Sequence, residues 1–360
     1  MAPRPWCARL RPRALAAFVA LVAFGLALAT TDRAKAALPA TIDSVQPRVA
    51  KIYGAGGFRG LEAYQSGAVI SAEGHILTVW SYVLDSDEIV VVLDDGRRFT
   101  AQLLGADPRL EVAILKIDAE DLPHFDLNLA AGAATGTRVL AFSNLYGVAT
   151  GDEAASVQHG VISARTRLEA RRGTFETPYR GDVYVLDAIT NNPGAAGGVL
   201  TDWQGRLLGL LGKELRNSLN NTWLNYAMPI GELADAVDRI LAGELSTRPA
   251  ADSTVKPTDP LSLDALGIVL VPDVLPRTPP YVDLVRTGSA ADDAGLLPDD
   301  LVLFVNDHLV QSCRDVRGEL EYIDRGAVAR LTVLRDNQLV EIVLAARRSA
   351  LPVSPEDAEP

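Results

Sequence analysis

Short apolar runs separated by glycine-containing turns fill the chain from Ile42 to Met228. Glu73-Gly74 and Asp95-Gly96 each stand between two such runs, and a tight turn of this kind is typical of a β-hairpin. Many short strands joined by such turns form all-β barrels or sandwiches. We therefore predict a mostly β protein, in which residues 45–125 are enough for one six-stranded barrel.

A second set of apolar runs extends from Thr137 to Met228 and predicts another barrel. The pattern then changes. In the stretch that follows, apolar residues recur three or four positions apart: Leu233, Val237, Ile240 and Leu241. This spacing places them on one face of a helix from Ile230 to Leu241. Two barrels closed by a helix make up the predicted first domain, residues 41–243.

The remaining sequence predicts a second domain, since 360 residues suit two domains better than one. Residues 244–260 are rich in Ser, Thr, Pro, Ala and Asp and predict a linker. Residues 261–348 alternate strand patterns with one or two helices, which predicts an α+β domain. Residues 349–360 end in Pro-Glu-Asp-Ala-Glu-Pro and predict a disordered tail.

Residues 1–36 are typical of a targeting segment. Basic residues precede an apolar run from Ala14 to Thr30, and Ala34-Lys35-Ala36 supplies small residues around a cleavage site. A cleaved signal peptide predicts export to the periplasm or cell envelope. A retained membrane anchor is the alternative, although the run is slightly shorter than a spanning helix requires.

Charge and histidine content argue against several kinds of function. The formal charge of −12 argues against nucleic-acid binding, which needs clustered Lys and Arg. His124, His159 and His308 are scattered, without Cys or carboxylates at metal-ligand spacing, so no metal site is predicted. The sequence has no phosphate-binding loop and no dinucleotide fingerprint. We therefore expect no cofactor.

Three segments carry a pattern associated with catalysis: Gly74–Val83, Asp107–Lys116 and Asn191–Leu200. In their order and separation they resemble trypsin-like serine proteases of the high-temperature-requirement (HtrA/Deg) family. In that family the third segment reads approximately Asn-Pro-Gly-Asn-Ser-Gly-Gly-Pro-Leu, and its serine is the nucleophile. The resemblance implies a trypsin-like double six-stranded β-barrel.

The resemblance also implies where a catalytic triad would lie, and all three positions have changed. The nucleophile position is Ala196, whose methyl group cannot attack a carbonyl. The position of the base is Ser81, and that of the orienting acid is Glu111. His75 lies six positions too early to serve as the base. Because the triad works as a unit, we expect no intact catalytic residue.

The loop around the nucleophile position keeps other features of the family. Gly194, Ala195 and Ala196 correspond to the oxyanion loop, whose main-chain N–H groups stabilise negative charge. Such a loop can hold a peptide carbonyl or a terminal carboxylate without cutting. The alternative is that its glycines are needed only for folding.

The C-terminal domain resembles the PDZ domains of the same family. Leu263–Val269 resembles the loop that receives a peptide carboxylate, and Gly288–Leu296 looks like the family's Ser-Pro-Ala-x-x-Ala-Gly-Leu helix. The resemblance implies peptide binding by strand addition at Leu266, Gly267, Ile268 and Val269. The long insert from Pro272 to Pro280 departs from the family pattern and is a candidate cover for this groove. A domain that only packs on the barrels and binds no peptide is the alternative.

Together these features predict an exported HtrA-like protein without proteolytic activity, which binds peptides, unfolded proteins or partner proteins. Its assembly into a homo-oligomer, or a mixed oligomer with an active paralogue, is part of this hypothesis. One alternative is an active serine endopeptidase in protein quality control that uses non-standard residues. Another is a structural envelope protein without peptide binding.

Overall fold

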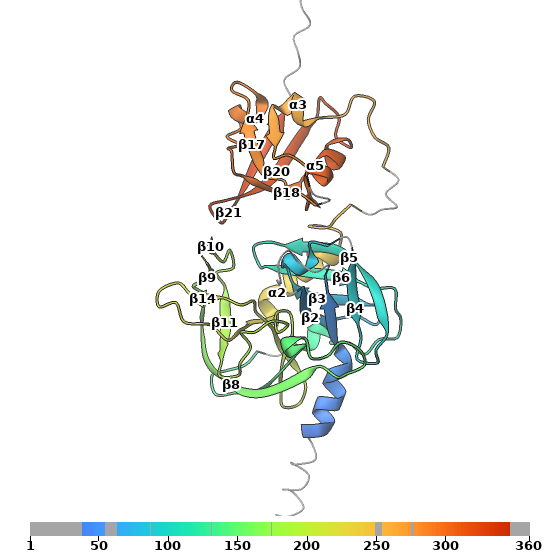
Figure 1. Ribbon diagram of the computed structural model, residues 1–360, viewed down its shortest axis with the longest axis vertical. Coiled ribbons are helices and arrows are strands. Elements are labelled where there is room, and N and C mark those ends of the chain that lie inside the picture. Colours follow the sequence, from blue (N-terminus) through green and yellow to red (C-terminus); the bar gives the residue numbers. More distant parts are fainter. Residues whose placement is uncertain are drawn as a thin grey trace, which may run out of the picture.

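The computed structural model describes residues 38–54, 63–86, 88–130, 132–173, 175–248, 254–274 and 277–345. The predicted signal segment and the predicted C-terminal tail lie outside these residues. Two β-barrels form the lower part of the molecule in Figure 1, and a C-terminal lobe, residues 261–345, forms the upper part.

The first barrel has the six strands predicted for residues 45–125. Its strands are closed in the order β1-β2-β3-β6-β5-β4. They are β1 (Val49–Tyr53), β2 (Tyr64–Val69), β3 (His75–Val79), β4 (Ile89–Val92), β5 (Arg98–Asp107) and β6 (Val112–Lys116). Neighbouring residues of β6 belong to different apolar clusters. Ile114 packs in a cluster that includes residues of the second barrel, and Leu115 packs in a cluster that includes residues of the C-terminal lobe. Burial on both faces explains why β6 is almost continuously apolar.

The second barrel is closed in the order β11-β15-β13-β12-β7-β8. Its strands are β7 (Arg138–Ser143), β8 (Ser156–Arg167), β11 (Asp182–Leu186), β12 (Val199–Asp202), β13 (Leu207–Leu211) and β15 (Tyr226–Pro229). Helix α2 (Ile230–Leu241) follows at the predicted residues, with Leu233, Val237 and Ile240 buried. Because α2 contacts β5 and β6 of the first barrel and β13 and β15 of the second, it fixes the two barrels relative to each other.

The C-terminal lobe combines two small antiparallel sheets with short helices. The sheets pair β16 with β17 and order β19-β18-β20-β21. The elements are α3 (Leu263–Leu266), β16 (Ile268–Leu270), β17 (Val282–Val285), α4 (Ala290–Asp293), β18 (Leu301–Val305), β19 (His308–Leu309), α5 (Cys313–Leu320), β20 (Val328–Arg335) and β21 (Gln338–Ala345). Val316 and Leu320 of α5 are buried in an apolar cluster of the lobe's own residues.

The structure also contains elements that the sequence patterns did not predict. Residues 38–45 are helical, where strands were expected from Ile42 onward. Leu38, Ile42 and Val45 lie on one face of this helix and pack against the main apolar cluster. A small sheet of β10 (Phe175–Glu176), β9 (Ala170–Arg172) and β14 (Arg216–Asn217) extends from the second barrel. Four 3-10 turns complete the described elements: η1 (Gln46–Arg48), η2 (Tyr82–Leu84), η3 (Leu127–Leu129) and η4 (Leu145–Gly147).

The first residues of the predicted linker pair with both folded parts. Leu245 O accepts a hydrogen bond from Ala106 N of β5 at 3.1 Å, and Ser246 O accepts one from Leu309 N of β19 at 2.8 Å. A Cβ at Gly105 would lie 2.3 Å from Leu245 O, so only glycine permits this approach. The segment therefore joins a barrel strand to the C-terminal lobe through main-chain contacts.

Arg248 adds a side-chain contact to the same connection. Its guanidinium lies 2.8 Å from the Glu319 carboxylate on α5, and the side chains are 17% and 11% exposed. The guanidinium also lies 4.0 Å from the centroid of the Tyr322 ring.

Within the described residues, no helix is long and apolar enough to cross a membrane.

We expect Glu319→Ala to lower the free energy of unfolding by about 1.5–3 kcal/mol, because it leaves a largely buried guanidinium without its carboxylate. Glu321→Ala is the matched control, since its ion pair with Lys256 is 50% exposed on both sides and should contribute less to stability. Guanidinium chloride unfolding of both variants measures the difference. Equal losses in the two variants would contradict the importance of the Arg248 contact.

Candidate functional site

Ser66 fastens the loop of residues 191–198 to the first barrel. Its backbone N–H donates to Ala196 O at 2.9 Å, and its hydroxyl donates to Gly194 O at 2.6 Å. The same hydroxyl accepts from Asn144 N, which follows β7 of the second barrel, at 2.8 Å. Ser66 is fully buried, so the loop is held where the two barrels meet.

The amide of Gly194 is directed away from the protein framework. The carbonyl of Pro193 accepts a hydrogen bond from Tyr146 N at 3.0 Å, and in a trans peptide the following N–H points the opposite way. Gly194 has a φ of +84°, and an added Cβ would lie 1.9 Å from Asn144 O. Both the backbone conformation and the space therefore require glycine here.

The amide of Ala196 is oriented in the same manner. The carbonyl of Ala195 accepts from Gly198 N at 2.9 Å, so the N–H of the next residue points away from that turn. Gly194 and Ala196 line one small cavity of about 40 Å³, and within the described part of the chain neither amide has a hydrogen-bond partner. Ala195 differs, because its own N–H donates to Asn192 O at 3.2 Å. Of the three predicted oxyanion-loop residues, Gly194 and Ala196 thus line the cavity, and their role as donors stays a prediction.

Ser81 is held as a structural hydroxyl. It caps the turn η2, where its Oγ accepts from Val83 N at 3.1 Å. The hydroxyl donates to Gln65 Oε1 at 2.5 Å, and the amide group of Gln65 donates in turn to Val79 O at 3.0 Å. The proton of Ser81 is therefore directed to a neutral amide, which does not act as a base.

Glu111 forms an ion pair with Lys213, which follows strand β13. The Glu111 and Lys213 side chains are 13% and 19% exposed, and the Thr177 hydroxyl donates to the same carboxylate. The ammonium of Lys213 also donates to Trp80 O at 3.3 Å. The Glu111 carboxylate therefore pairs with a lysine side chain rather than with an imidazole.

Tyr226 lies behind this ion pair. Its hydroxyl accepts from the backbone N–H of Lys213 at 3.2 Å. Burial, together with the nearby charge of Glu111, raises the pKa of Tyr226 well above its usual range. A phenol with a raised pKa keeps its proton at neutral pH and offers no base to the site.

The three predicted triad positions lie around two cavities that share part of their lining. Ser81 and Ala196 line the smaller cavity, while Ser81 and Glu111 line a second cavity of about 290 Å³. Lys213 and Arg172 line both. His75 lies at the far end of β3, where its ring nitrogen contacts the Ser71 hydroxyl at 2.7 Å.

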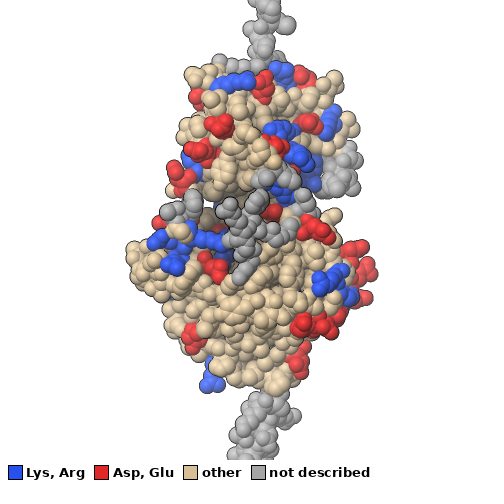
Figure 2. All heavy atoms as spheres, in the orientation of Figure 1, with Lys and Arg blue, Asp and Glu red and all other residues tan. Residues whose placement is uncertain are grey.

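Lys213 and Arg172 were missed by the sequence patterns. Lys213 follows the five buried residues of β13 after Gly212, and a charged residue shortly after such a strand was the available signal. Arg172 comes from the small sheet that was not predicted, and its guanidinium lies 5.3 Å from the centroid of the Tyr82 ring. Figure 2 shows basic side chains gathered over this sheet, at the left of the barrels. The two cations line the cleft together with four carboxylates: Asp85, Glu111, Glu176 and Glu214.

The predicted carboxylate-binding loop lies at the start of β16. Gly267 has a φ of +78° and ends α3, and its carbonyl accepts from Arg286 N at 2.9 Å. With Ile268 opposite Val285 in this ladder, the main-chain groups of Ile268 face the edge opposite β17. Leu266 and Ile268 are buried, whereas Val269 is partly exposed.

The predicted cover of this groove is attached to α5. Thr278 O accepts from Cys313 N at 2.9 Å, and Asp273 forms an ion pair with Arg317 at 3.0 Å. Both contacts join the insert to the helix that lies in the same lobe as β16.

Among the described residues, no group of three His, Cys, Asp or Glu side chains is arranged to hold a metal ion.

The double barrel and the loop at Ala196 define the fold class of the trypsin-like serine proteases. Residues 65–210 match the trypsin-like peptidase domain family. A probable periplasmic serine endoprotease, DegP-like, of Halomonas elongata is 32% identical over 276 residues, which are 76% of this chain and 54% of that protein. A protein of the same description from Chlamydia trachomatis is 28% identical over 277 residues, 77% of this chain and 52% of that protein.

These matches show that the chain is similar to HtrA/DegP-type trypsin-like serine proteases. The chain spans about half the length of these curated relatives. Among solved structures, the HtrA-type protease AlgW with a tripeptide is 26% identical, with coverage of 85% of this chain and 95% of that chain and a TM-score of 0.46.

A double-mutant cycle with Lys213→Met and Glu111→Gln should give a coupling free energy of about 1–3 kcal/mol, because the pair is largely buried. The control is a cycle at Arg97 and Asp95, whose ion pair is half exposed and should give a coupling below about 1 kcal/mol. Denaturant unfolding measures both. A coupling at Lys213 no larger than at Arg97 would show that the ion pair does not organise the cleft.

Proposed function

We propose that this protein is an exported HtrA-like protein without proteolytic activity, which binds peptides or unfolded proteins in a protease-shaped cleft. One observation carries the proposal. At the nucleophile position the side chain is only the methyl group of Ala196, while the amides of Ala196 and Gly194 remain directed toward the cavity. Such donors can bind a carbonyl or carboxylate oxygen without any bond being cleaved.

The contacts of the neighbouring side chains support inactivity. A nucleophile needs an adjacent base, and no histidine is among the described residues that line the two cavities. The Ser81 hydroxyl donates to Gln65, and the Lys213 side chain is paired with Glu111 and donates to Trp80 O. Neither contact brings Lys213 to the Ser81 hydroxyl, so this arrangement disfavours a lysine-assisted serine.

We further propose that the C-terminal lobe, with boundaries at about residues 261–348, is a PDZ domain with its own peptide site at Leu266, Gly267, Ile268 and Val269. The outward-facing main chain of Ile268 supports strand addition. The insert attached to α5 supports restricted access to this groove. The protease-fold domain would then comprise residues 41–243.

The periplasmic relatives and the N-terminal segment together support a periplasmic or envelope location. A protein of this kind would hold unfolded clients, or regulate an active paralogue in a mixed oligomer. An active endopeptidase with non-standard residues is the second candidate, favoured only by the nearness of Ser81 and Lys213 around the same cavities.

Ala196→Ser alone should not create protease activity, because no histidine is among the described residues that line the two cavities. Adding Ser81→His and Glu111→Asp supplies the base and its acid. Adding Lys213→Ala removes the side chain that pairs with the carboxylate at position 111. Digestion of fluorescein-labelled casein at high protein concentration measures turnover. Activity of the wild type that is lost in Ser81→Ala would establish the second candidate instead.

Binding of an unfolded client should depend on the cleft. Ala196→Phe places a phenyl group in a cavity of about 40 Å³ and should weaken binding of reduced, alkylated and fluorescein-labelled α-lactalbumin by about tenfold. Ala196→Ser is the control and should bind within about twofold of the wild type. Fluorescence anisotropy measures affinity, and thermal unfolding confirms that both variants are folded. Wild-type affinity of a folded Ala196→Phe would exclude the cleft as the binding site.

A further inference from the structure

The β20–β21 hairpin of the C-terminal lobe reaches the cleft of the barrels. At its tip Asp336 and Asn337 have φ values of +48° and +60°, as in a tight two-residue hairpin turn. The side-chain amide of Asn337 donates to Glu176 O of β10 at 2.6 Å. Figure 1 shows the end of β21 beside β10 accordingly. The lobe therefore contacts the small sheet next to the cleft through this hairpin.

Apolar packing holds the lobe in this position. The register of β18 against β20 shifts between Val302 and Phe304, and a bulge of this kind re-aims a side chain. Leu303 and Phe304, each 3% exposed, belong to an apolar cluster of the first barrel. Val302 and Val305 belong to the lobe's own cluster. Because Leu334 of β20 packs against the same barrel cluster, the hairpin is fixed relative to the first barrel.

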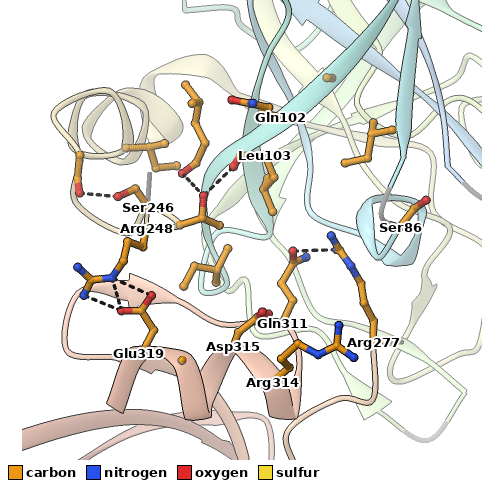
Figure 3. Close-up of a pocket in the computed structure, with 18 of the residues that line it drawn as sticks. Ser86, Gln102, Leu103, Ser246, Arg248, Arg277, Gln311, Arg314, Asp315 and Glu319 are labelled. Carbon is orange, nitrogen blue, oxygen red and sulfur yellow. Dashed lines mark hydrogen bonds and ion pairs between the residues drawn. The ribbon is translucent and has the colours of Figure 1, made fainter. Parts of the chain in front are cut away.

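The linker holds the lobe at a second place. Figure 3 shows the Arg248 guanidinium beside Glu319 of α5, with side chains that are 17% and 11% exposed. Ser246 O accepts from Leu309 N of β19 at 2.8 Å. With contacts at the hairpin, at β18 and at the linker, the lobe has a defined place on the barrels.

The hairpin forms one wall of the cavity of about 290 Å³ that Ser81 and Glu111 also line. The first barrel, the second barrel and the lobe all contribute apolar or aromatic side chains to its lining: Trp80, Tyr82, Pro108, Pro178, Leu215 and Leu334. Its volume is near the lower limit for ligand pockets in proteins. The cavity therefore suits a large side chain better than a whole small-molecule ligand.

The charged side chains of this lining already have partners within the protein. The partners are Lys213 for Glu111, Arg180 for Glu176, Gln311 for Asp85 and the Tyr82 ring for Arg172. A charged group that entered the cavity would compete with these contacts and lose its own hydration. An apolar group leaves the contacts intact and gains burial, so the lining favours an apolar occupant.

This cavity adjoins the small cavity at Ala196, because Ser81, Tyr82, Arg172 and Lys213 line both. We propose that it is a specificity pocket, which takes a large apolar or aromatic side chain of a peptide bound in the cleft. Leu334 and Asn337 of the lobe supply one of its walls. The proposal rests on the proposed binding function of the cleft and names the class of side chain that a client must carry.

The first test compares two fluorescein-labelled peptides on the full chain. One is Ser-Ala-Ser-Trp-Ser-Ala-Ser amide, and the other has serine in place of tryptophan. The amide end removes the carboxylate that the groove beside β16 would receive. Fluorescence anisotropy should show saturable binding of the tryptophan peptide, at least about tenfold tighter than that of the serine peptide. Equal affinities, or no saturable binding of the tryptophan peptide, would overturn the proposal.

Leu334→Asp places a carboxylate in the wall and should weaken binding of the tryptophan peptide at least about tenfold. Val343→Asp is the matched control, because Val343 is 54% exposed on the same hairpin and lies outside the cavity lining. It should bind within about twofold of the wild type. Thermal unfolding shows whether each variant is folded.

Asn337→Gly is a second variant, since Leu334 also packs against the barrel. Glycine accepts a φ of +60°, so the turn is kept while the hydrogen bond to Glu176 O is lost. The tryptophan peptide should bind about threefold more weakly, and the serine peptide within about twofold of the wild type. Unchanged affinity in Asn337→Gly and in folded Leu334→Asp would contradict a wall formed by the lobe.

Photo-crosslinking locates the side chain. A peptide with p-benzoylphenylalanine in place of tryptophan should form adducts with residues 80–82, 177–178 or 334–337, which mass spectrometry identifies after digestion. Adducts confined to residues 268–270 would place the peptide in the other groove and overturn the proposal.

Binding of α-lactalbumin separates this proposal from that of the cleft. Weaker binding by Ala196→Phe but not by folded Leu334→Asp would keep the cleft as the client site and reject only the pocket. Wild-type affinity of folded Ala196→Phe would reject the cleft function itself, and with it the basis of the pocket.

Discussion

The hydrogen bonds of Ser66 are the constraint on which the cleft depends. One buried residue of the first barrel holds the carbonyls of Gly194 and Ala196 and also contacts Asn144 of the second barrel. These contacts fix the loop against both barrels, and the positive φ of Gly194 allows the chain to pass close to Asn144 O. The backbone geometry of a protease loop is thereby maintained by packing and hydrogen bonds that do not require a nucleophile.

The side chains at two of the three predicted triad positions, Ser81 and Glu111, are held by hydrogen bonds and an ion pair. Lys213 reaches the carboxylate of Glu111 from the second barrel, so the position that the resemblance assigns to the partner of an imidazole holds an ion pair between the two barrels. Since a buried carboxylate without a partner is destabilising, this lysine compensates for the missing base. The same contact occupies the groups that could have moved a proton. The ion pair therefore joins the two barrels and engages the carboxylate of Glu111 at the same time.

Sequence patterns predicted the parts of the fold that repeat a local period. The continuous apolar residues of β6 and the helical spacing of α2 are confirmed in the structure. The Glu111–Lys213 pair joins residues 102 positions apart and leaves no local signal. Strands of two or three residues, such as β10 and β14, are too short to show a period. The polar composition of the predicted linker did not reveal that Ser246 pairs with β5 and β19, because main-chain pairing does not depend on side-chain polarity.

Intact-mass measurement after treatment with a fluorophosphonate shows whether any cleft side chain can act as a nucleophile. The purified wild-type protein should keep its unmodified mass, because Ala196 offers no hydroxyl and Ser81 has no base to remove its proton. A single phosphonyl adduct on Ser81, or on another serine of the cleft, would contradict this interpretation and identify a working catalytic centre.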